Sequence, residues 1–294
     1  MLACAGLPWL AQTVLADRTS AAQPVPAYVE TALADPSRPD TDRQRDATRK
    51  PAALIAFASI KPGDKVADFM PDGGYFTRIF CKVVGDAGHV YVIGVTRLAT
   101  APPPEQLPSP SAPPQSIPSA SAAAGACHNV TTSNLKSRLV PAQELHDDSD
   151  PGYMYEYWTS SPAAENFTAP EPLDVIWTSD NYRDLHNKAF GSPDMSRVNT
   201  ALLAALKPGG LLLIEDHPAV VGPGARHSAS LHRIPAGDVT APAAPVAVEQ
   251  VRQEVTQAGF EFAGELHDGE DTRSANSHAV HHETERFLLK FRKP

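Results

Sequence analysis

The residues best suited to chemistry lie at the ends of short apolar runs in the 294-residue chain. Asp68 ends one such run, Asp180 and Asn181 end another, and His217 ends a third, beside Asp216. A carboxylate accepts hydrogen bonds from hydroxyl or ammonium groups, and a histidine beside a carboxylate can act as a general base. Such residues predict a site that binds a polar ligand and moves a proton.

A glycine turn follows Asp68 and adds main-chain donors to these side chains. The segment KVADFMPDGGYFTRIF, residues 65–80, reads as a buried strand, a turn over 71–74 and a helix with an apolar face. Glycine lets a ligand approach the main chain, and the free N–H groups at a helix start bind polar or anionic groups. We therefore expect a cofactor to lie over Gly73 and Gly74.

Three side chains are candidates for catalysis, and each also has a structural interpretation. His217 is a candidate general base oriented by Asp216, but it could equally bond a loop backbone. His186 follows Asp184 and has the same two interpretations. Tyr182 could line the acceptor site or pack in the core. No metal site is expected, because His278, His281 and His282 lack a carboxylate at ligand spacing.

Strands alternate with helices along the chain, which predicts an α/β fold: a doubly wound, mostly parallel sheet with helices on both faces. Two strands at the end of the chain suggest an antiparallel strand added at one edge. Ligands of such sheets bind at the carboxyl ends of the strands, where Asp68, Gly94, Asp180 and His217 would meet. The predicted strands cover 66–67, 89–95, 130–135, 173–178, 211–214, 260–266 and 286–291.

A single domain over residues 17–294 is expected, with three segments that differ from it in composition. Residues 1–16 are apolar and end in small residues, as before a signal-peptidase site, but they lack a basic start; a frayed apolar arm is the alternative. Residues 17–60 predict a helical extension, and 101–126, rich in Pro, Ser and Ala, a surface insertion. A cleaved leader would place the protein in the periplasm or outside the cell; otherwise it is cytoplasmic.

Charge and cysteine content narrow the choice of partners. A net charge of −9 without a dense basic run argues against nucleic acid, and no segment is long enough for a membrane span. Cys81 is expected to be a buried thiol, or to pair with Cys127 in an oxidising compartment. A small-molecule substrate is the expected partner, with the oligomeric state left open.

The chain resembles class I S-adenosylmethionine-dependent methyltransferases, and among them a bacterial group that is often exported. The segments that carry the resemblance are 66–80, DVIWTSDNYRDLHN (174–187), LKPGGLLLIEDH (206–217), LHRI (231–234) and ERFLLKFRKP (285–294). The resemblance implies a Rossmann-like, seven-stranded sheet with an antiparallel last strand. It also implies that S-adenosyl-L-methionine is the cofactor.

Residue roles follow from the same resemblance. It implies that the methionine end of the cofactor lies against Asp68 and the main chain of the turn, and that Asp180 and Asn181 lie near the sulfonium. Two departures stand out, because Asp72 replaces a usual glycine and Gly94 stands where an acid usually binds the ribose. The cofactor-binding residues implied are Asp68, Met70, Pro71, Asp72, Gly73, Gly74, Gly94, Asp180 and Asn181.

Three functions remain open from the sequence. The first is methyl transfer from S-adenosylmethionine to a small molecule. The second is a binding protein with the same fold and an eroded site, which Asp72 and Gly94 favour. The third, weaker, is a nicotinamide-dependent oxidoreductase, which would need three spaced glycines and a ribose-binding acid.

Overall fold

The computed structural model describes residues 24–71, 73–95, 125, 127–141, 158–186, 193–217, 247–268 and 286–294. Several predicted features lie outside these residues: the segment 1–16, all of the insertion 101–126 except Gly125, Asp72, the segment 231–234, and the histidines at 278, 281 and 282. Among the described helices, none has both the length and the apolar character needed to cross a bilayer.

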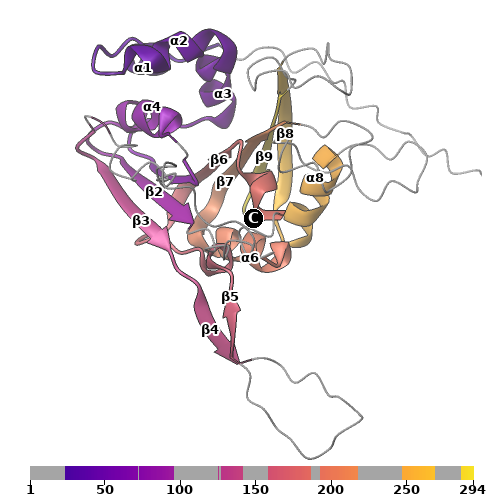
Figure 1. Cartoon of the computed structure of the whole chain (residues 1–294). Helices are drawn as coiled ribbons and strands as arrows, with labels where there is room; N and C mark the ends of the chain where they lie inside the picture. Colours follow the sequence, from indigo (N-terminus) through magenta and orange to yellow (C-terminus); the bar gives the residue numbers. More distant parts are fainter. Residues whose placement is uncertain are drawn as a thin grey trace, which may run out of the picture.

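The core is one seven-stranded sheet in the order β3-β2-β1-β6-β7-β9-β8 (Figure 1). All neighbours pair in parallel except β9, which runs antiparallel to both β7 and β8. The mostly parallel sheet with an antiparallel last strand is thereby confirmed. The expected position of that strand was wrong: β9 lies inside the sheet and β8 forms the edge. The strands are β1 (Lys65–Phe69), β2 (His89–Val95), β3 (Val130–Leu135), β6 (Leu173–Ser179), β7 (Leu206–Asp216), β8 (Glu261–Asp268) and β9 (Arg286–Arg292).

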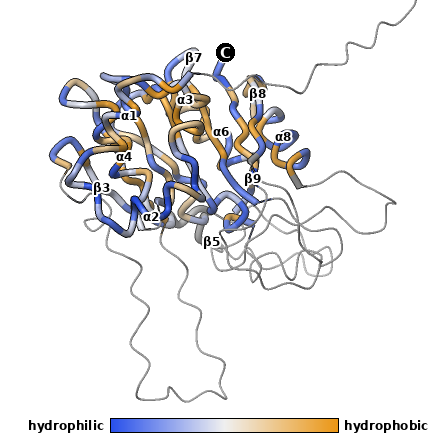
Figure 2. Tube along the Cα trace, turned by 90° about the horizontal axis from the view of Figure 1, so that it is seen from above, coloured by the Kyte–Doolittle hydropathy of each residue, from blue (hydrophilic) through white to orange (hydrophobic). Residues whose placement is uncertain are grey.

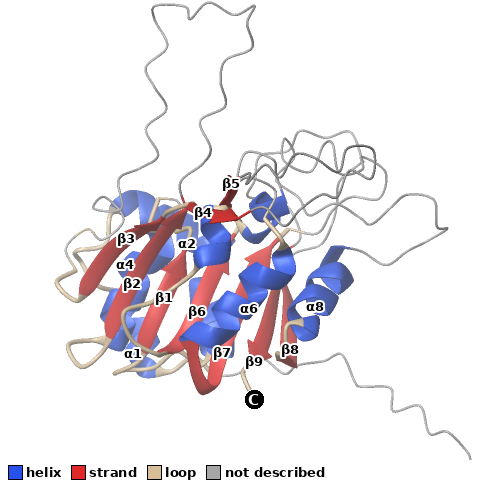
Figure 3. Cartoon of the chain, turned by 90° about the horizontal axis from the view of Figure 1, so that it is seen from below, coloured by secondary structure: helices blue, strands red, loops and turns tan. Residues whose placement is uncertain are grey.

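Helices cover both faces of this sheet, as Figure 3 shows. On one face α1 (Ala27–Leu33), α3 (Pro51–Ala58) and α4 (Tyr75–Val84) bury an apolar cluster against the strands. On the other, α6 (Met195–Ala205), α8 (Ala247–Gln257) and the short helix η1 (Ala163–Asn166) bury a second. Apolar residues accordingly line the interior in Figure 2. Two apolar layers on one sheet are what the alternating pattern predicts.

A two-stranded arm leaves the main body after β3. Strands β4 (Arg138–Pro141) and β5 (Trp158–Ser161) pair antiparallel and form a separate small sheet. Figure 1 shows this pair extending away from the seven-stranded sheet. None of the strands predicted from the sequence lies in this region, so the pair is a feature that the composition did not reveal.

The N-terminal extension is helical and lies on α4. Helix α2 (Asp40–Arg49) ends where Lys50 adopts a left-handed φ of 44°, and α3 begins afresh at Pro51. Asp42 makes a two-pronged ion pair with Arg78 of α4, at 2.6 and 2.9 Å. These contacts fasten the first turn of α2 to α4.

Strand β7 begins earlier than its sequence predicts. The sequence predicts a strand from residue 211, yet β7 already starts at Leu206 and includes the Pro-Gly-Gly stretch over 208–210. Main-chain hydrogen bonds of 2.9 Å join Gly209 and Gly210 to Lys293, while Gly209 keeps a left-handed φ of 76° at an irregularity of the strand. Pairing with the distant C-terminus therefore adds this stretch to the strand although Gly209 keeps a turn-like conformation.

Candidate active site

The carboxyl ends of β1, β6 and β7 are joined by short polar contacts. The Asn181 side chain donates to the Met70 carbonyl oxygen, 2.5 Å away, and so ties the end of β6 to the turn after β1. The Asp180 N–H donates to the Glu215 carbonyl oxygen at 2.9 Å, which ties β6 to β7. The carboxyl ends of these three strands thus lie close together, as the sequence predicts.

Two residues of the glycine turn have left-handed backbone conformations, one of which is unusual because it is not a glycine. Met70 and Gly74 both have positive φ angles, 58° and 74°, and the Gly74 N–H donates to the Pro71 carbonyl oxygen at 2.9 Å. Among the residues that the structure describes, and leaving aside its chain neighbours, Gly73 has no atom within 4 Å of the point where its Cβ would stand. Open space beside the main chain at Gly73 fits a ligand that approaches the backbone closely.

Asp68 lies below this turn and caps the helix that follows it. Thr77 donates its hydroxyl to the Asp68 carboxylate at 2.5 Å, and its main-chain N–H also bonds this carboxylate. Burial raises the pKa of Asp68 to about 7 even though these hydrogen bonds oppose the shift. The structure therefore gives Asp68 a capping role, and its contact with a cofactor stays a prediction.

Gly94 lies next to Asn134 on the neighbouring strand. The two residues are partners in the β2–β3 register, and a Cβ on Gly94 would overlap the Asn134 amide oxygen. The position predicted to face the ribose is therefore beside an uncharged hydrogen-bonding side chain instead of an acid.

A buried ionic cluster, which we call the Arg49 cluster, lies across the ends of β6 and β7. Arg49 at the end of α2 donates to Asp180 at 2.6 Å, to the Ser179 hydroxyl at 2.5 Å and to Glu215 at 3.1 Å. Burial alone would raise the pKa of Asp180, but Arg49 and His217 hold it well below its ordinary value. Asp180 is therefore an anion across the physiological range of pH.

Arg49 was not identified from the sequence, nor was Arg286, which contacts the same cluster. The Arg286 guanidinium lies 3.4 Å from the His217 Nε2 and 4.0 Å from Glu215. One sequence signal was available: Glu215 is a charged residue at the end of an otherwise apolar strand, and a buried carboxylate needs a cation. The sequence did not show which of the many arginines supplies it.

His217 lies in the Arg49 cluster, but its carboxylate partner differs from the expected one. The His217 Nε2 is 3.2 Å from Asp180, whereas Asp216 accepts hydrogen bonds from the His217 main-chain N–H at 2.8 Å and from the Arg183 side chain. The expectation that Asp216 orients the ring was therefore wrong, because Asp216 neutralises buried Arg183 instead.

Tyr182 and His186 belong to a separate cluster on the face of the sheet that α6 and α8 cover. The Tyr182 hydroxyl contacts Asn199 of α6 and Glu254 of α8, while the His186 Nε2 lies 3.2 Å from both Glu254 oxygens. Burial lowers the pKa of His186, but Glu254 outweighs it and raises the pKa above the ordinary value. These contacts fasten η2 (Tyr182–His186) to α6 and α8, and their predicted catalytic roles stay untested.

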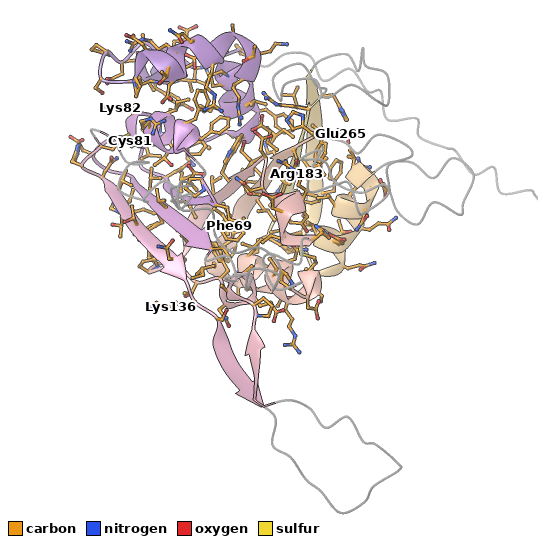
Figure 4. The ribbon with its side chains drawn as sticks, in the orientation of Figure 1. Phe69, Cys81, Lys82, Lys136, Arg183 and Glu265 are labelled. Atoms are coloured by element: carbon orange, nitrogen blue, oxygen red, sulfur yellow. A yellow bond between two sulfur atoms is a disulfide. The ribbon has the colours of Figure 1, made fainter. Side chains whose placement is uncertain are left out.

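Figure 4 shows where Arg183 and Cys81 lie in the fold. Arg183, next to the strand ends, lies toward the middle of the molecule, and Cys81 and Lys82 lie on α4 toward the N-terminal helices. Cys81 forms a disulfide with Cys127, with the Cα atoms 6.1 Å apart. The sequence left open whether Cys81 is a free thiol or pairs with Cys127, and the structure contains the disulfide.

Comparison with known proteins gives a likeness of fold. No family model matches the chain, and no curated protein matches it. Among solved structures, it is similar to a SAM-dependent methyltransferase from Aquifex aeolicus (15% identity, TM-score 0.45, 90% of this chain and 97% of that one). It is also similar to the N-methyltransferase NodS from Bradyrhizobium japonicum (13%, 0.46, 87% and 98%). A third is the arsenic(III) S-adenosylmethionine methyltransferase CrArsM from Chlamydomonas reinhardtii (14%, 0.49, 92% and 74%). Likeness at this level does not transfer an activity.

Proposed function

We propose that this chain is an S-adenosylmethionine-dependent methyltransferase that acts on a small molecule. One observation carries the proposal: the open glycine turn after β1 and the anionic end of β6 are bonded together through Asn181 and the Met70 carbonyl. A cofactor that carries both cationic and polar groups needs such a pairing of backbone donors and a fixed carboxylate. The net charge of −9 favours a small acceptor over nucleic acid.

The residues of the glycine turn and those that follow β6 and β7 then have definite tasks. S-adenosylmethionine, when bound, supplies an electrophilic methyl group on a sulfonium. The turn from Met70 to Gly74 would hold its amino-acid end, and Asp180 with Asn181 would lie near its positive charge. His217, next to anionic Asp180, would accept the proton of an acceptor that must be deprotonated. The rest of the contribution is alignment of the two reactants.

Calorimetric titration of the purified protein with S-adenosylmethionine, S-adenosylhomocysteine and NAD tests this proposal. We expect saturable binding of the first two and a higher melting temperature with each, since a ligand that binds only the folded state stabilises it. Binding of NAD alone would favour an oxidoreductase instead. No binding of either adenosyl compound would reject the proposal.

The variant Gly73→Ala sharpens the test. A methyl group at this position enters open space, so it should leave the melting temperature of the ligand-free protein unchanged. It would nevertheless occupy the place where the cofactor meets the main chain, and we expect a loss of affinity of about tenfold or more. Unchanged affinity in a folded variant would place the ligand elsewhere.

We further propose that the protein is exported and that residues 1–16 are a signal peptide. The disulfide between Cys81 and Cys127 supports this, because such bonds persist mainly in oxidising compartments. Expression of the full chain in a bacterium followed by intact-mass analysis gives the test. A periplasmic product that begins at Asp17 is expected, and a cytoplasmic product that retains Met1 would contradict export.

A further inference from the structure

Arg49 contacts the segments beside two groups of predicted cofactor residues, those of the glycine turn and those at the end of β6. Its guanidinium lies over the rings of Tyr75 and Phe76, at 5.5 and 5.1 Å, at the start of the helix that follows the glycine turn. The same group bonds Asp180 and Ser179 at the end of β6, as well as Glu215 at the end of β7. One side chain from the N-terminal extension therefore joins three parts of the sheet edge.

The hydrogen bond from Arg49 holds Asp180 in an unfavourable backbone conformation. Asp180 has a φ of 60°, a left-handed conformation that a residue other than glycine adopts at an energetic cost. Strain of this kind persists where the surroundings fix it, and Arg49 supplies a hydrogen bond of 2.6 Å to the Asp180 carboxylate. The orientation of Asp180 thus depends on a residue that is 131 positions away in the sequence.

Charges on every side of Asp180 make Arg49 hard to replace. Glu215 and Asp216 on β7 are fully buried carboxylates that repel the Asp180 carboxylate, whereas His217 and Arg286 attract the Asp180 carboxylate. Removing Arg49 would leave Asp180 and Glu215 with less compensation, and buried like charges favour uptake of a proton. A proton taken up by this pair would reduce the negative charge that the predicted role of Asp180 requires.

We propose that Arg49 is a positioning residue of the cofactor site, so that the N-terminal helices form part of that site. This inference rests on the proposed methyltransferase function and adds a specific residue to it. A planar guanidinium can bond Asp180, Ser179 and Glu215 at once while it lies over two aromatic rings. A lysine keeps the charge but cannot reproduce this geometry.

The test compares Arg49→Gln and Arg49→Lys with the matched control Arg43→Gln. Arg43 lies on the same helix, and its side chain is 39% exposed. Cofactor affinity is measured by calorimetry from pH 6 to pH 8, and the ionisation of labelled aspartate is followed by ¹³C NMR without any ligand. Circular dichroism confirms that each variant is folded.

We expect Arg49→Gln to bind S-adenosylhomocysteine at least tenfold more weakly at pH 6 and to recover affinity as the pH rises, since the proton taken up by the Asp180 and Glu215 pair is then released. Arg49→Lys should recover part of the affinity, and Arg43→Gln should match the wild type. A folded Arg49→Gln protein with wild-type affinity and an unchanged pH profile would overturn the inference. Failure of the wild type to bind would instead reject the proposed function and this inference with it.

If Arg49→Gln does not fold, Arg49→Lys alone decides. An affinity weakened at both pH 6 and pH 8 in this charge-preserving variant supports positioning by the guanidinium. Wild-type affinity in the lysine variant overturns it, because charge alone would then be sufficient.

Discussion

At the scale of single residues, one carboxylate shows how burial changes the role of a side chain. Asp68 was identified from its position at a strand end, and the structure adds Thr77 as its partner, nine residues later. Its side chain is 2% exposed, so its negative charge is costly. Burial raises the pKa of Asp68 to about 7, which makes the protonated form common at neutral pH.

This shift predicts a pH-dependent effect of Asp68→Asn on stability. A carboxyl with a raised pKa in the folded state binds more protons folded than unfolded between pH 4 and pH 7, so its contribution to stability falls as the pH rises through that range. The amide carries no charge and escapes this loss. The difference in unfolding free energy should therefore move in favour of the variant by about 4 kcal/mol over this range.

Urea denaturation at several pH values measures this difference. The variant Asp40→Asn is the control, since the Asp40 side chain is 82% exposed. A constant difference between Asp68→Asn and wild type from pH 4 to pH 7 would show that the Asp68 pKa is not raised.

At the scale of elements, the sequence predicted strands well and side-chain partners poorly. The strand 173–179 and the strand 89–95 are apolar runs between turn signals, so local pattern was enough to find them. Arg49 could not be assigned in this way, because its partners Asp180 and Glu215 are 131 and 166 positions away. Nor could β7 be bounded correctly, since its first residues are held by the C-terminus.

Two glycines at strand ends provide a comparison of element packing. A Cβ on Gly88 would lie 2.7 Å from the Val84 carbonyl oxygen and 2.8 Å from that of Asp64, and backbone atoms cannot easily move away. Gly88→Ala should therefore lower the unfolding free energy by about 1–3 kcal/mol. A Cβ on Gly94 would overlap the Asn134 side chain, which is exposed and can rotate, and would lie at an ordinary contact distance of 3.7 Å from the Ser133 carbonyl oxygen, so we expect no loss of stability for Gly94→Ala. Thermal and urea unfolding of both variants check this, and equal losses would contradict it.

At the scale of the whole molecule, the disulfide joins two parts of the fold that the sequence separates. Cys81 lies on α4, and Cys127 precedes β3, the edge strand that pairs with β2 alone. Asn129 reinforces the link by donating to the Cys81 and Gly85 carbonyl oxygens at 3.0 and 2.8 Å. The disulfide and Asn129 thus fasten the segment before β3 to α4 and to the turn that follows it.

Loss of this bond should destabilise the entire protein and not only its edge. The two cysteines are 46 positions apart, and closing a loop of that length restricts the unfolded chain by about 4 kcal/mol on the chain-entropy estimate. We expect the double variant Cys81→Ala/Cys127→Ala to unfold at a lower urea concentration than the oxidised wild type. Treating the wild type with a reductant should bring it close to the double variant, while the reductant should leave the double variant unchanged. If reduction does not shift the wild-type transition, the bond does not form in the folded protein, and the structural support for export is removed with it.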